Sequence, residues 1–361
     1  MSQERSLLRA LLQNQVYHRH CCRDFGRNGH DAQHVREPVV AMRLPQRFYR
    51  LPVQFDADRL RTEVAALPPQ AWAPHPNGDT GNFAVRLISV EGGENEQLNG
   101  VMRMTPHLER SPYLRQLLAS FGVVWSRSRL LRLAPGAVVP PHADINYHWF
   151  YRVRLHVPIV TRPQVQFTCD GESVHMAPGE AWVFDNWRLH QVQNPTDTER
   201  IHLVGDTSGS ASFWELVARS EKADTPVQHH AFDAARSASP LMERSLLRPV
   251  MPPAEMDLLI LDMRSELVPE VDSPDQRVRL ARYHALLLAL CRDWRQLYSL
   301  HGEEPAGWDS FAKLRDVIRA KSQPLAQGLA LRTNRSAAHR VLEARILRAC
   351  LSMPVGPSAA T

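Results

Sequence analysis

The feature that most constrains the fold is a run of short strand candidates between residues 128 and 205. Turns rich in glycine and proline separate them, among them Ala134-Pro135-Gly136, Asp170-Gly171 and Ala177-Pro178-Gly179-Glu180. Short strands at regular spacing with such turns are typical of an all-β sandwich or barrel, whereas βαβ units would place helices between the strands. We therefore predict a mainly β core. The expected strands are 128–133, 153–160, 164–168, 173–176, 181–185, 191–194 and 200–205.

The sequence on either side of this stretch differs in character. Residues 1–41 are rich in His, Arg, Gly and Cys and show neither helical nor strand periodicity, so we expect a disordered extension there. The alternative is a metal site, but the His and Cys residues fit no tetrahedral ligand spacing. Residues 42–220 are expected to form the β domain, with a helix over 57–67 capped by Asp56, a strand over 84–90 and a helix over 112–121. Residues 221–253 are predicted to be a linker, and 254–361 a helical region. The helices expected beyond residue 252 are 253–267, 275–301, 308–320 and 334–351.

Composition excludes several classes of protein. Apolar residues make up 43% of the 361-residue chain, and no run is long enough for a membrane span, so we expect no membrane association. The start has no signal-peptide pattern, which predicts a cytoplasmic protein. The five cysteines are scattered and form no C-x-x-C pair, which argues against a disulfide framework. The net charge of +5 comes almost entirely from arginine and does not by itself indicate a nucleic-acid partner, so none is expected.

Three residues have the chemistry of a metal site. His142 and Asp144 are two positions apart on an extended segment, so their side chains point to the same side. His190 lies 48 residues after His142, just past the expected strand 181–185. Two histidines and one carboxylate form the facial triad of non-heme Fe(II) oxygenases, which leaves open positions for a co-substrate and O2. The sequence therefore predicts an iron site at His142, Asp144 and His190.

One arginine, Arg200, follows these three residues on the next expected strand. Arg200 follows His190 by ten residues on the next expected strand, where it could bind the distal carboxylate of a small dicarboxylate through a bidentate pair. His148 and His202 are alternative metal ligands, and His202 shares the face of Arg200. We prefer His190 because of its spacing to Arg200.

Longer segments around these residues carry a family resemblance. They are Pro-Gly-Ala-Val-Val-Pro-Pro-His ending at His142, Arg-Val-Arg-Leu-His ending at His156, Pro-Gly-Glu-Ala-Trp-Val-Phe-Asp ending at Asp185, and then His190 and Arg200. On these segments, the stretch from about residue 129 to residue 217 resembles the aspartyl/asparaginyl β-hydroxylase family of Fe(II)- and 2-oxoglutarate-dependent oxygenases. The animal peptidyl hydroxylases of that family have glycine where this chain has Asp144, whereas its small-molecule hydroxylases keep the carboxylate.

The resemblance implies a fold and a reaction. The fold would be a double-stranded β-helix, a jelly-roll or cupin-like core, with flanking helices and a C-terminal α-helical region. The reaction would hydroxylate an amino-acid-like or peptidyl (Asp/Asn-type) carboxylate-bearing substrate with Fe(2+), 2-oxoglutarate and O2, releasing succinate and CO2. The implied roles are iron binding by His142, Asp144 and His190, oxoglutarate binding by Arg200, Arg154 and His156, and substrate binding by Arg129 and Arg152.

Other interpretations remain open from the residues alone. Arg152, Arg154 and His156 alternate along an expected strand, so they could form a merely solvated sheet face. A jelly-roll module could also bind ligands without catalysis. The C-terminal helices could recruit a protein substrate, form a homodimer or simply brace the core; amphipathic helices are most often packing elements.

Overall fold

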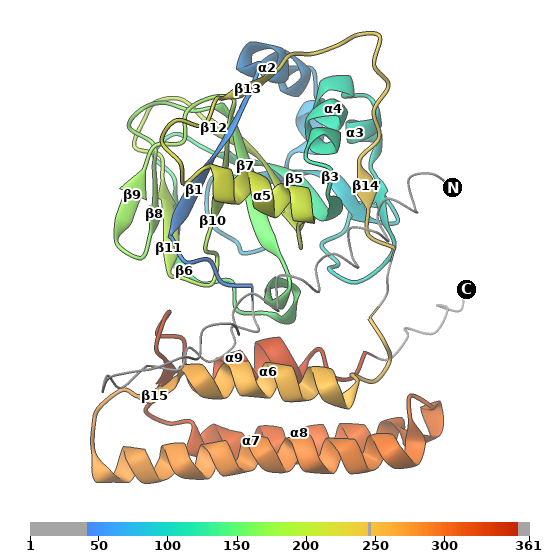
Figure 1. Ribbon diagram of the computed structural model, residues 1–361, viewed down its shortest axis with the longest axis vertical. Coiled ribbons are helices and arrows are strands. Elements are labelled where there is room, and N and C mark those ends of the chain that lie inside the picture. The colour runs from blue at the N-terminus through green and yellow to red at the C-terminus, as the bar shows by residue number, and fades with distance from the viewer. Residues whose placement is uncertain (1–41, 245–246, 353–361) are drawn as a thin grey trace, which may run out of the picture.

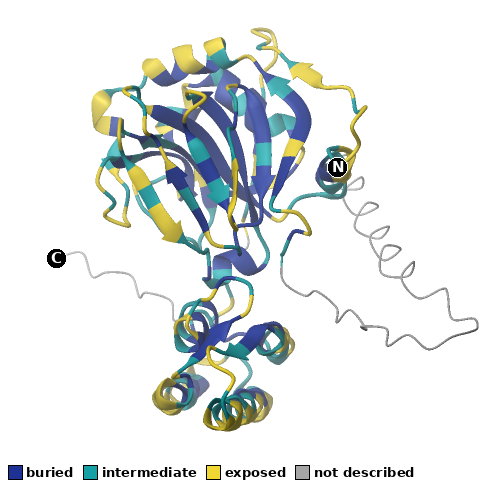
Figure 2. Ribbon diagram, turned by 90° about the vertical axis from the view of Figure 1, so that its left-hand side faces the viewer, coloured by how far each residue is buried: buried dark blue, intermediate teal, exposed yellow. Residues whose placement is uncertain are grey.

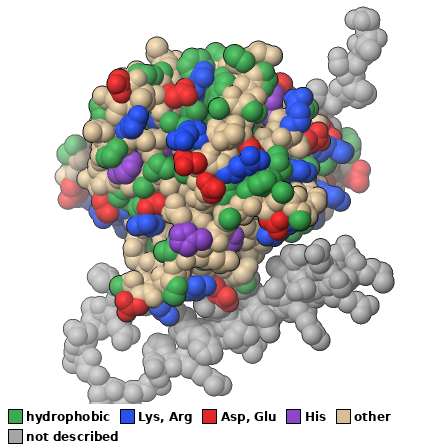
Figure 3. Space-filling model, turned by 90° about the horizontal axis from the view of Figure 1, so that it is seen from above, with side chains coloured by type: hydrophobic (Ala, Val, Ile, Leu, Met, Phe, Trp, Pro, Cys, Tyr) green, Lys and Arg blue, Asp and Glu red, His purple; other side chains and the backbone are tan. Residues whose placement is uncertain are grey.

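The structure is a computed structural model that describes residues 42–244 and 247–352, so the extension expected over 1–41 lies outside the described residues. A β-rich body lies above a group of helices formed by the C-terminal part of the chain (Figure 1). No helix in the described part is long and apolar enough to cross a membrane. Acidic and basic side chains are interspersed on the face in Figure 3, so the excess positive charge forms no single patch on that face.

The β-rich body is built on one large sheet. Its strand order is β13-β1-β10-β7-β12-β5-β3-β2, with β4 also paired to β3 and β14 to β5. The five central neighbours from β1 to β5 are antiparallel. The bounds are β1 Phe48–Phe55, β2 Ala73–Pro74, β3 Asn82–Val90, β4 Met102–Met104, β5 Val124–Leu133, β7 Val153–Val160, β10 Glu180–Phe184, β12 Arg200–Thr207, β13 Gln228–His230 and β14 Leu241–Met242.

A smaller sheet faces this one. Its order is β6-β11-β8-β9, all antiparallel, with bounds β6 Val138–His142, β8 Gln166–Cys169, β9 Glu172–Val174 and β11 His190–Gln193. From β5 to β12 the chain passes back and forth between the two sheets, which is the winding of a double-stranded β-helix. The predicted fold class is therefore confirmed. The core between the sheets consists of Phe48, Leu133, Phe167, Cys169, Met176, Phe184 and Val192.

Helices cover the outer face of the large sheet. They are α2 (Ala57–Ala65), α3 (Pro106–Glu109), α4 (Pro112–Ser120) and α5 (Ala211–Arg219). The predicted cap of α2 is present, because the Asp56 carboxylate accepts a hydrogen bond from the Arg59 amide at 3.0 Å. Seven of the eight residues of β7 are buried, since α2 packs on one face of this strand and the smaller sheet faces the other.

The remaining helices lie below the β-rich body. They are α6 (Pro253–Glu266), α7 (Pro274–His301), α8 (Trp308–Leu325) and α9 (Ala338–Val341), the last continued by a wide turn, η4 (Leu342–Leu347). A two-stranded antiparallel sheet of β15 (Leu267–Pro269) and β16 (Leu329–Leu331) joins the two ends of the α7–α8 segment. In Figure 1, α6 and α9 lie next to the body, with α7 and α8 beneath them, and Figure 2 shows that the outward faces are the exposed ones.

The helices and the body share one apolar core. Ile145, Phe150 and Trp187 from the body pack with the buried side chains of α6, α7 and η4. Phe150 belongs to a short helical turn, η2 (Tyr147–Phe150), that contacts η4. Because Ile145 and Trp187 lie in the loops that follow β6 and β10, the helices support the loops next to the expected metal ligands.

Two parts of the chain differ from their sequence-based description. Residues 221–253, expected to be a linker, contribute β13 and β14, which pair in parallel with β1 and β5. The helix expected over 334–351 begins only at Ala338, because the Asn334 side chain is buried and donates to the Trp187 carbonyl at 3.0 Å. That contact requires the chain at Asn334 to lie against the β-rich body.

One turn of the β-rich body should tolerate no side chain. Gly179 has φ of +80°, and a Cβ there would lie 2.2 Å from the Phe55 carbonyl oxygen. We expect Gly179→Ala to lower the free energy of unfolding by about 2 to 4 kcal/mol, because strain and a backbone clash add. Gly171 is a matched control, since φ is +79° but nothing lies within 4 Å of its Cβ, and Gly171→Ala should cost about 1 kcal/mol. Denaturant unfolding would measure both, and equal losses would contradict the clash.

Candidate active site

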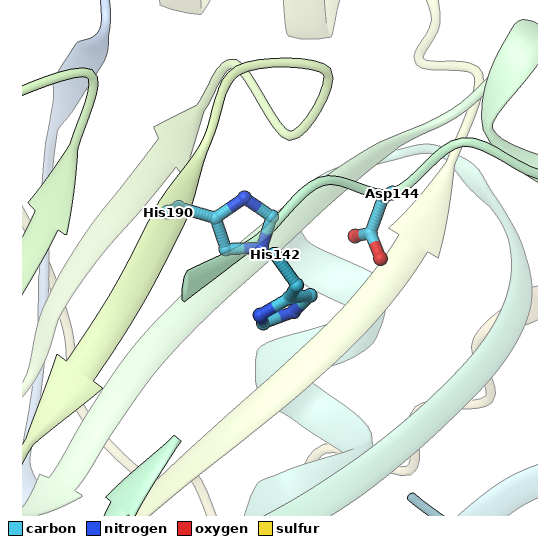
Figure 4. Close-up of side chains that lie close together, drawn as sticks. All are labelled: His142, Asp144 and His190. Carbon is cyan, nitrogen blue, oxygen red and sulfur yellow. The ribbon is translucent and has the colours of Figure 1, made fainter. Parts of the chain in front are cut away.

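The three predicted metal ligands converge at one end of the smaller sheet. His142 ends β6 and His190 begins β11, and the two lie directly opposite each other in the antiparallel pair. Asp144 follows two residues after β6, where its amide donates to the Asn186 carbonyl at 3.0 Å. One ligand atom from each of the three side chains lies within 4.8 Å of the others. Figure 4 shows the two imidazole rings side by side with the Asp144 carboxylate beside them.

Hydrogen bonds fix the orientation of both imidazole rings. The His142 Nδ1 lies 2.9 Å from the Pro140 carbonyl oxygen, and the His190 Nδ1 lies 2.9 Å from the Arg188 carbonyl oxygen. A carbonyl can only accept, so each Nδ1 donates and each Nε2 keeps a free lone pair. Burial lowers the pKa of His190 to about 4, which keeps this ring neutral. The buried Asp144 Oδ2 has no hydrogen-bond partner among the described residues. This donor set fits Fe(2+).

A cavity of about 220 Å³ opens beside these ligands, and Arg200 is buried in its wall. Arg200 is 3% exposed, and no carboxylate of the described residues lies within ion-pair distance of it. Its Nη2 donates to the His202 Nδ1 at 2.7 Å, while its Nε has no partner in the same part of the chain. Burial lowers the pKa of this guanidinium to about 9. A buried cation without a counter-charge is costly, so this position fits an anionic ligand.

His156 lies close to Arg200 in the same cavity. It stands on β7, is 4% exposed, and neither ring nitrogen has a partner among the residues described. Its ring packs edge-on against Phe167 and Phe184, with centroids 5.4 Å away in each case. Burial, with the positive charge of Arg200 second, lowers the pKa of His156 well below its usual range. His156 is therefore a neutral polar group available to a ligand.

Three arginines line the cavity from the large sheet. Arg127 and Arg129 stand on β5 and Arg154 on β7. Arg154 pairs with Asp206 at 2.8 Å, and both β5 arginines contact the Glu96 carboxylate, at 3.1 and 3.2 Å.

The arginines outnumber the carboxylates that hold them. Arg127, Arg129 and Arg154 share two carboxylates, Glu96 and Asp206, so the cluster carries excess positive charge facing the cavity. Arg86, which also pairs with Glu96 at 2.9 Å, has Glu94 as a second partner at 2.9 Å. Although burial alone would raise the pKa of Asp206, Arg154 and the hydrogen bond from His148 hold it well below its usual range. A carboxylate on a bound substrate would complete this cluster.

The structure brings most of the predicted site residues into this one cavity. They are His142, Asp144, His190, Arg200, Arg154, His156 and Arg129. The alternative metal ligands are not part of the group in the described residues that could hold a metal ion: His202 contacts Arg200, and His148 contacts Asp206 at 3.2 Å.

Arg152 is the exception. The structure does not place it in the metal cavity beside Arg129. Strand β7 begins at Val153, as predicted, so the alternation that places Arg154 and His156 in the cavity does not extend back to Arg152. Its Nη1 donates to the His148 carbonyl at 3.1 Å, and its Nη2 pairs with Glu243. It lines a neighbouring cavity instead.

Sequence reasoning missed several residues of the site. Arg127 could have been found, because it stands two positions before Arg129 and therefore on the same strand face. Glu96 and Asp206 are far in sequence from Arg127, Arg129 and Arg154, and only the folded sheet brings them to these arginines. Trp149, whose ring lies 4.4 Å from the Arg154 guanidinium, gave no signal separable from ordinary packing.

Comparison with known proteins bears on this geometry. Residues 90–208 match the aspartyl/asparaginyl beta-hydroxylase family. The resemblance predicted from the sequence is thereby confirmed for this part of the chain. The match ends at residue 208, so α6 to α9 lie outside it.

Two curated relatives are hydroxylases of a free amino acid by name. L-proline cis-3-hydroxylase 1 of Streptomyces sp is 24% identical over 184 residues, covering 46% of this chain and 61% of that protein. L-proline cis-4-hydroxylase of Rhizobium meliloti (strain 1021) is 25% identical over 167 residues, covering 44% of this chain and 60% of that protein. The chain thus spans about three-fifths of the length of these relatives. A solved 2OG-Fe(II) oxygenase family oxidoreductase from Burkholderia pseudomallei is 17% identical, with 44% of this chain and 80% of that chain covered and a TM-score of 0.32.

Proposed function

We propose that this chain is an Fe(II)- and 2-oxoglutarate-dependent dioxygenase that hydroxylates a carboxylate-bearing, amino-acid-like substrate and releases succinate and CO2. One observation carries the proposal: an uncompensated buried arginine shares a small cavity with two histidines and a carboxylate in facial-triad order. A dicarboxylate co-substrate and a metal would satisfy both features at once. The L-proline hydroxylases among the relatives support a small substrate of this kind.

The residues of the cavity divide into two groups. His142, Asp144 and His190 would hold iron, leaving three of six positions for ligands. When bound, the iron supplies the oxidising chemistry: O2 and oxoglutarate are consumed, a substrate C–H bond becomes C–OH, and succinate and CO2 are released. Arg200 would bind the far carboxylate of oxoglutarate, with His156 beside it as a neutral hydrogen-bonding group.

The arginines on β5 and β7 would hold the substrate. Arg127, Arg129 and Arg154 carry more positive charge than Glu96 and Asp206 neutralise, and they line the same cavity as the metal ligands. We propose that they bind the substrate carboxylate and so fix which carbon lies nearest the metal. A free amino acid such as proline fits this site, as does an Asp- or Asn-type residue with a free carboxylate.

Succinate release tests the proposal directly. The chain is loaded with Fe(II) and oxoglutarate without oxygen and then exposed to air with a panel of free amino acids and short peptides. We expect substrate-dependent succinate that disappears with a chelator and returns with added Fe(II).

Asp144→Ala should lower turnover at least a hundredfold, because it removes one of three metal ligands. Asp197→Asn, an exposed residue outside the cavity, serves as the control. If Asp144→Ala kept wild-type turnover, or if the loaded chain neither bound oxoglutarate nor formed succinate with any substrate, the proposal would be wrong. In the second case a binding module would be the better description.

A further inference from the structure

A second cavity of about 550 Å³ adjoins the metal cavity. It lies between the β-rich body and the C-terminal helices, and the two cavities share Leu98 and Asn146 as lining residues. Its volume is in the range of cavities that bind small molecules. Ala344 and Glu255 contribute to its helical wall, and both lie outside the stretch that matches the hydroxylase family.

Glu255 is the charged side chain of this cavity that has no oppositely charged partner among the described residues. It stands in the first turn of α6, and the Tyr147 hydroxyl donates to its carboxylate. Among the described residues it forms no ion pair. Every arginine that lines the cavity, by contrast, has an acidic partner. These pairs are Arg152 with Glu243, Arg248 with Glu303 and Arg348 with Glu343.

Two further side chains offer hydrogen-bond acceptors without partners. His148 is 4% exposed, and its Nε2 lies 3.2 Å from the Asp206 Oδ2, which can only accept. The proton therefore sits on Nε2, and the His148 Nδ1 is a buried acceptor with no partner in the described chain. Burial lowers the pKa of His148, which is consistent with a neutral ring. The Asn146 Oδ1 also has no partner there.

Tyrosines complete the environment of Glu255. Tyr147 and Tyr151 both line the cavity, and their rings pack edge-on with centroids 6.2 Å apart. Burial, together with Glu255, raises the pKa of Tyr151 to about 12. Burial and the hydrogen bond to Glu255 also raise the pKa of Tyr147, so both hydroxyls are neutral. Aromatic rings of this kind attract cations.

We infer that the substrate extends from the metal cavity past Leu98 and Asn146 into this second cavity, where Glu255 binds an ammonium or guanidinium group on its far end. Such a group donates several hydrogen bonds and carries the charge that Glu255 lacks, and the His148 Nδ1 and Asn146 Oδ1 can accept from it. The arginines of the metal cavity would hold the carboxylate at the opposite end. The inference deepens the proposed function and rests on it for which end is hydroxylated.

Matched peptides test the inference by binding rather than by turnover. The probes are N-acetyl-arginyl-proline, N-acetyl-arginyl-aspartate and N-acetyl-arginyl-asparagine, each paired with its citrulline analogue. Citrulline keeps the shape of arginine but lacks its charge. Calorimetry on the full chain, with and without Fe(II) and oxoglutarate and with oxygen excluded, gives each dissociation constant. We expect at least one arginyl peptide to bind about tenfold or more tightly than its citrullyl partner.

Variants in α6 test whether Glu255 is responsible for the preference for arginyl over citrullyl peptides. Glu255→Gln should abolish it, because glutamine keeps the size and loses the charge. Asp257→Asn is the control, since Asp257 stands two residues further on the same helix and pairs with Arg295 in a different surface pocket. Asp257→Asn should keep the preference unchanged. The comparison of peptides on the wild-type chain needs no variant, so it holds even if Glu255→Gln fails to fold.

The outcomes separate this inference from the proposed function. Equal binding of arginyl and citrullyl peptides, binding of neither up to millimolar concentration, or a preference that survives in Glu255→Gln would overturn the inference. A charge preference in a chain that neither binds oxoglutarate nor forms succinate would retain the cation site and reject the dioxygenase. Succinate formation without any preference for the arginyl peptides would retain the dioxygenase and reject the cation site.

Discussion

Arg200→Met should weaken oxoglutarate binding by about a hundredfold or more and, at the same time, make the ligand-free chain more stable. The first effect follows from the loss of a bidentate, charge-assisted pair, which is worth about 3 kcal/mol or more. The second follows because Arg200 is 3% exposed and has no carboxylate partner among the described residues. Replacing a buried, unpaired charge by an apolar side chain of similar length should add about 1 to 4 kcal/mol to the free energy of unfolding.

The opposite signs make this prediction specific to ligand binding. Replacing a residue that only stabilises the fold would make the protein less stable. Replacing a residue that is kept for ligand binding at the expense of stability would make the protein more stable. Calorimetry with oxoglutarate gives the affinity, and thermal unfolding without ligand gives the stability. Arg162→Met, on an exposed position outside the cavity, should change neither. An unchanged oxoglutarate affinity, or a lower melting temperature for Arg200→Met, would contradict this role for Arg200.

Much of the metal site is readable from the sequence because it depends on local spacing. His142 and Asp144 are two residues apart on an extended segment, and alternation alone places them on one side. His190 and Arg200 each stand at the first residue of a strand, and the ten-residue interval between them is one short strand and one turn. This geometry depends on residues that are close together in the sequence, so it can be predicted without knowing how the rest of the chain folds.

The arginine cluster could not be predicted in full, because its partners are distant in sequence. Glu96 lies in the loop between β3 and β4, and Asp206 lies near the end of β12. Arg152 was expected in the cavity because it alternates with Arg154 and His156, but the strand begins at Val153, as predicted, and Arg152 lies just before it. Alternation of side chains applies only within a strand, so it does not determine which cavity is reached by a residue that stands just before the strand.

The same distinction applies to the fold. The strands from β7 to β12 are bounded by glycine and proline turns and were predicted within about two residues. Strand β1 was missed, because Pro52 interrupts it and six of its eight residues are buried, which hides the alternation. The role of the C-terminal helices also depends on tertiary contacts, such as the Arg345 guanidinium that lies 3.9 Å from the Trp187 ring centroid.

The acidic partners of the cluster carry the largest expected effect on stability. Asp206 is 1% exposed and accepts hydrogen bonds from Arg154 and His148, while Arg127 lies 3.7 Å away. Asp206→Asn keeps the shape but removes the only carboxylate that pairs with Arg154 among the described residues. We expect the free energy of unfolding to fall by about 3 to 5 kcal/mol at neutral pH, because a buried guanidinium loses its counter-charge.

The pH dependence of this loss gives a second check. The pKa of Asp206 is held well below its usual range in the folded chain, so its contribution is fully present above the unfolded pKa of about 3.9 and is lost as the pH falls below that value. Unfolding of wild type and Asp206→Asn should therefore differ by a constant amount from pH 5 upward and converge in more acidic solution. Asp197→Asn, exposed and outside the cluster, should stay within about 0.5 kcal/mol of wild type. A loss below about 1 kcal/mol for Asp206→Asn, or a difference that grows as the solution becomes more acidic, would show that the arginines do not depend on Asp206 for their counter-charge.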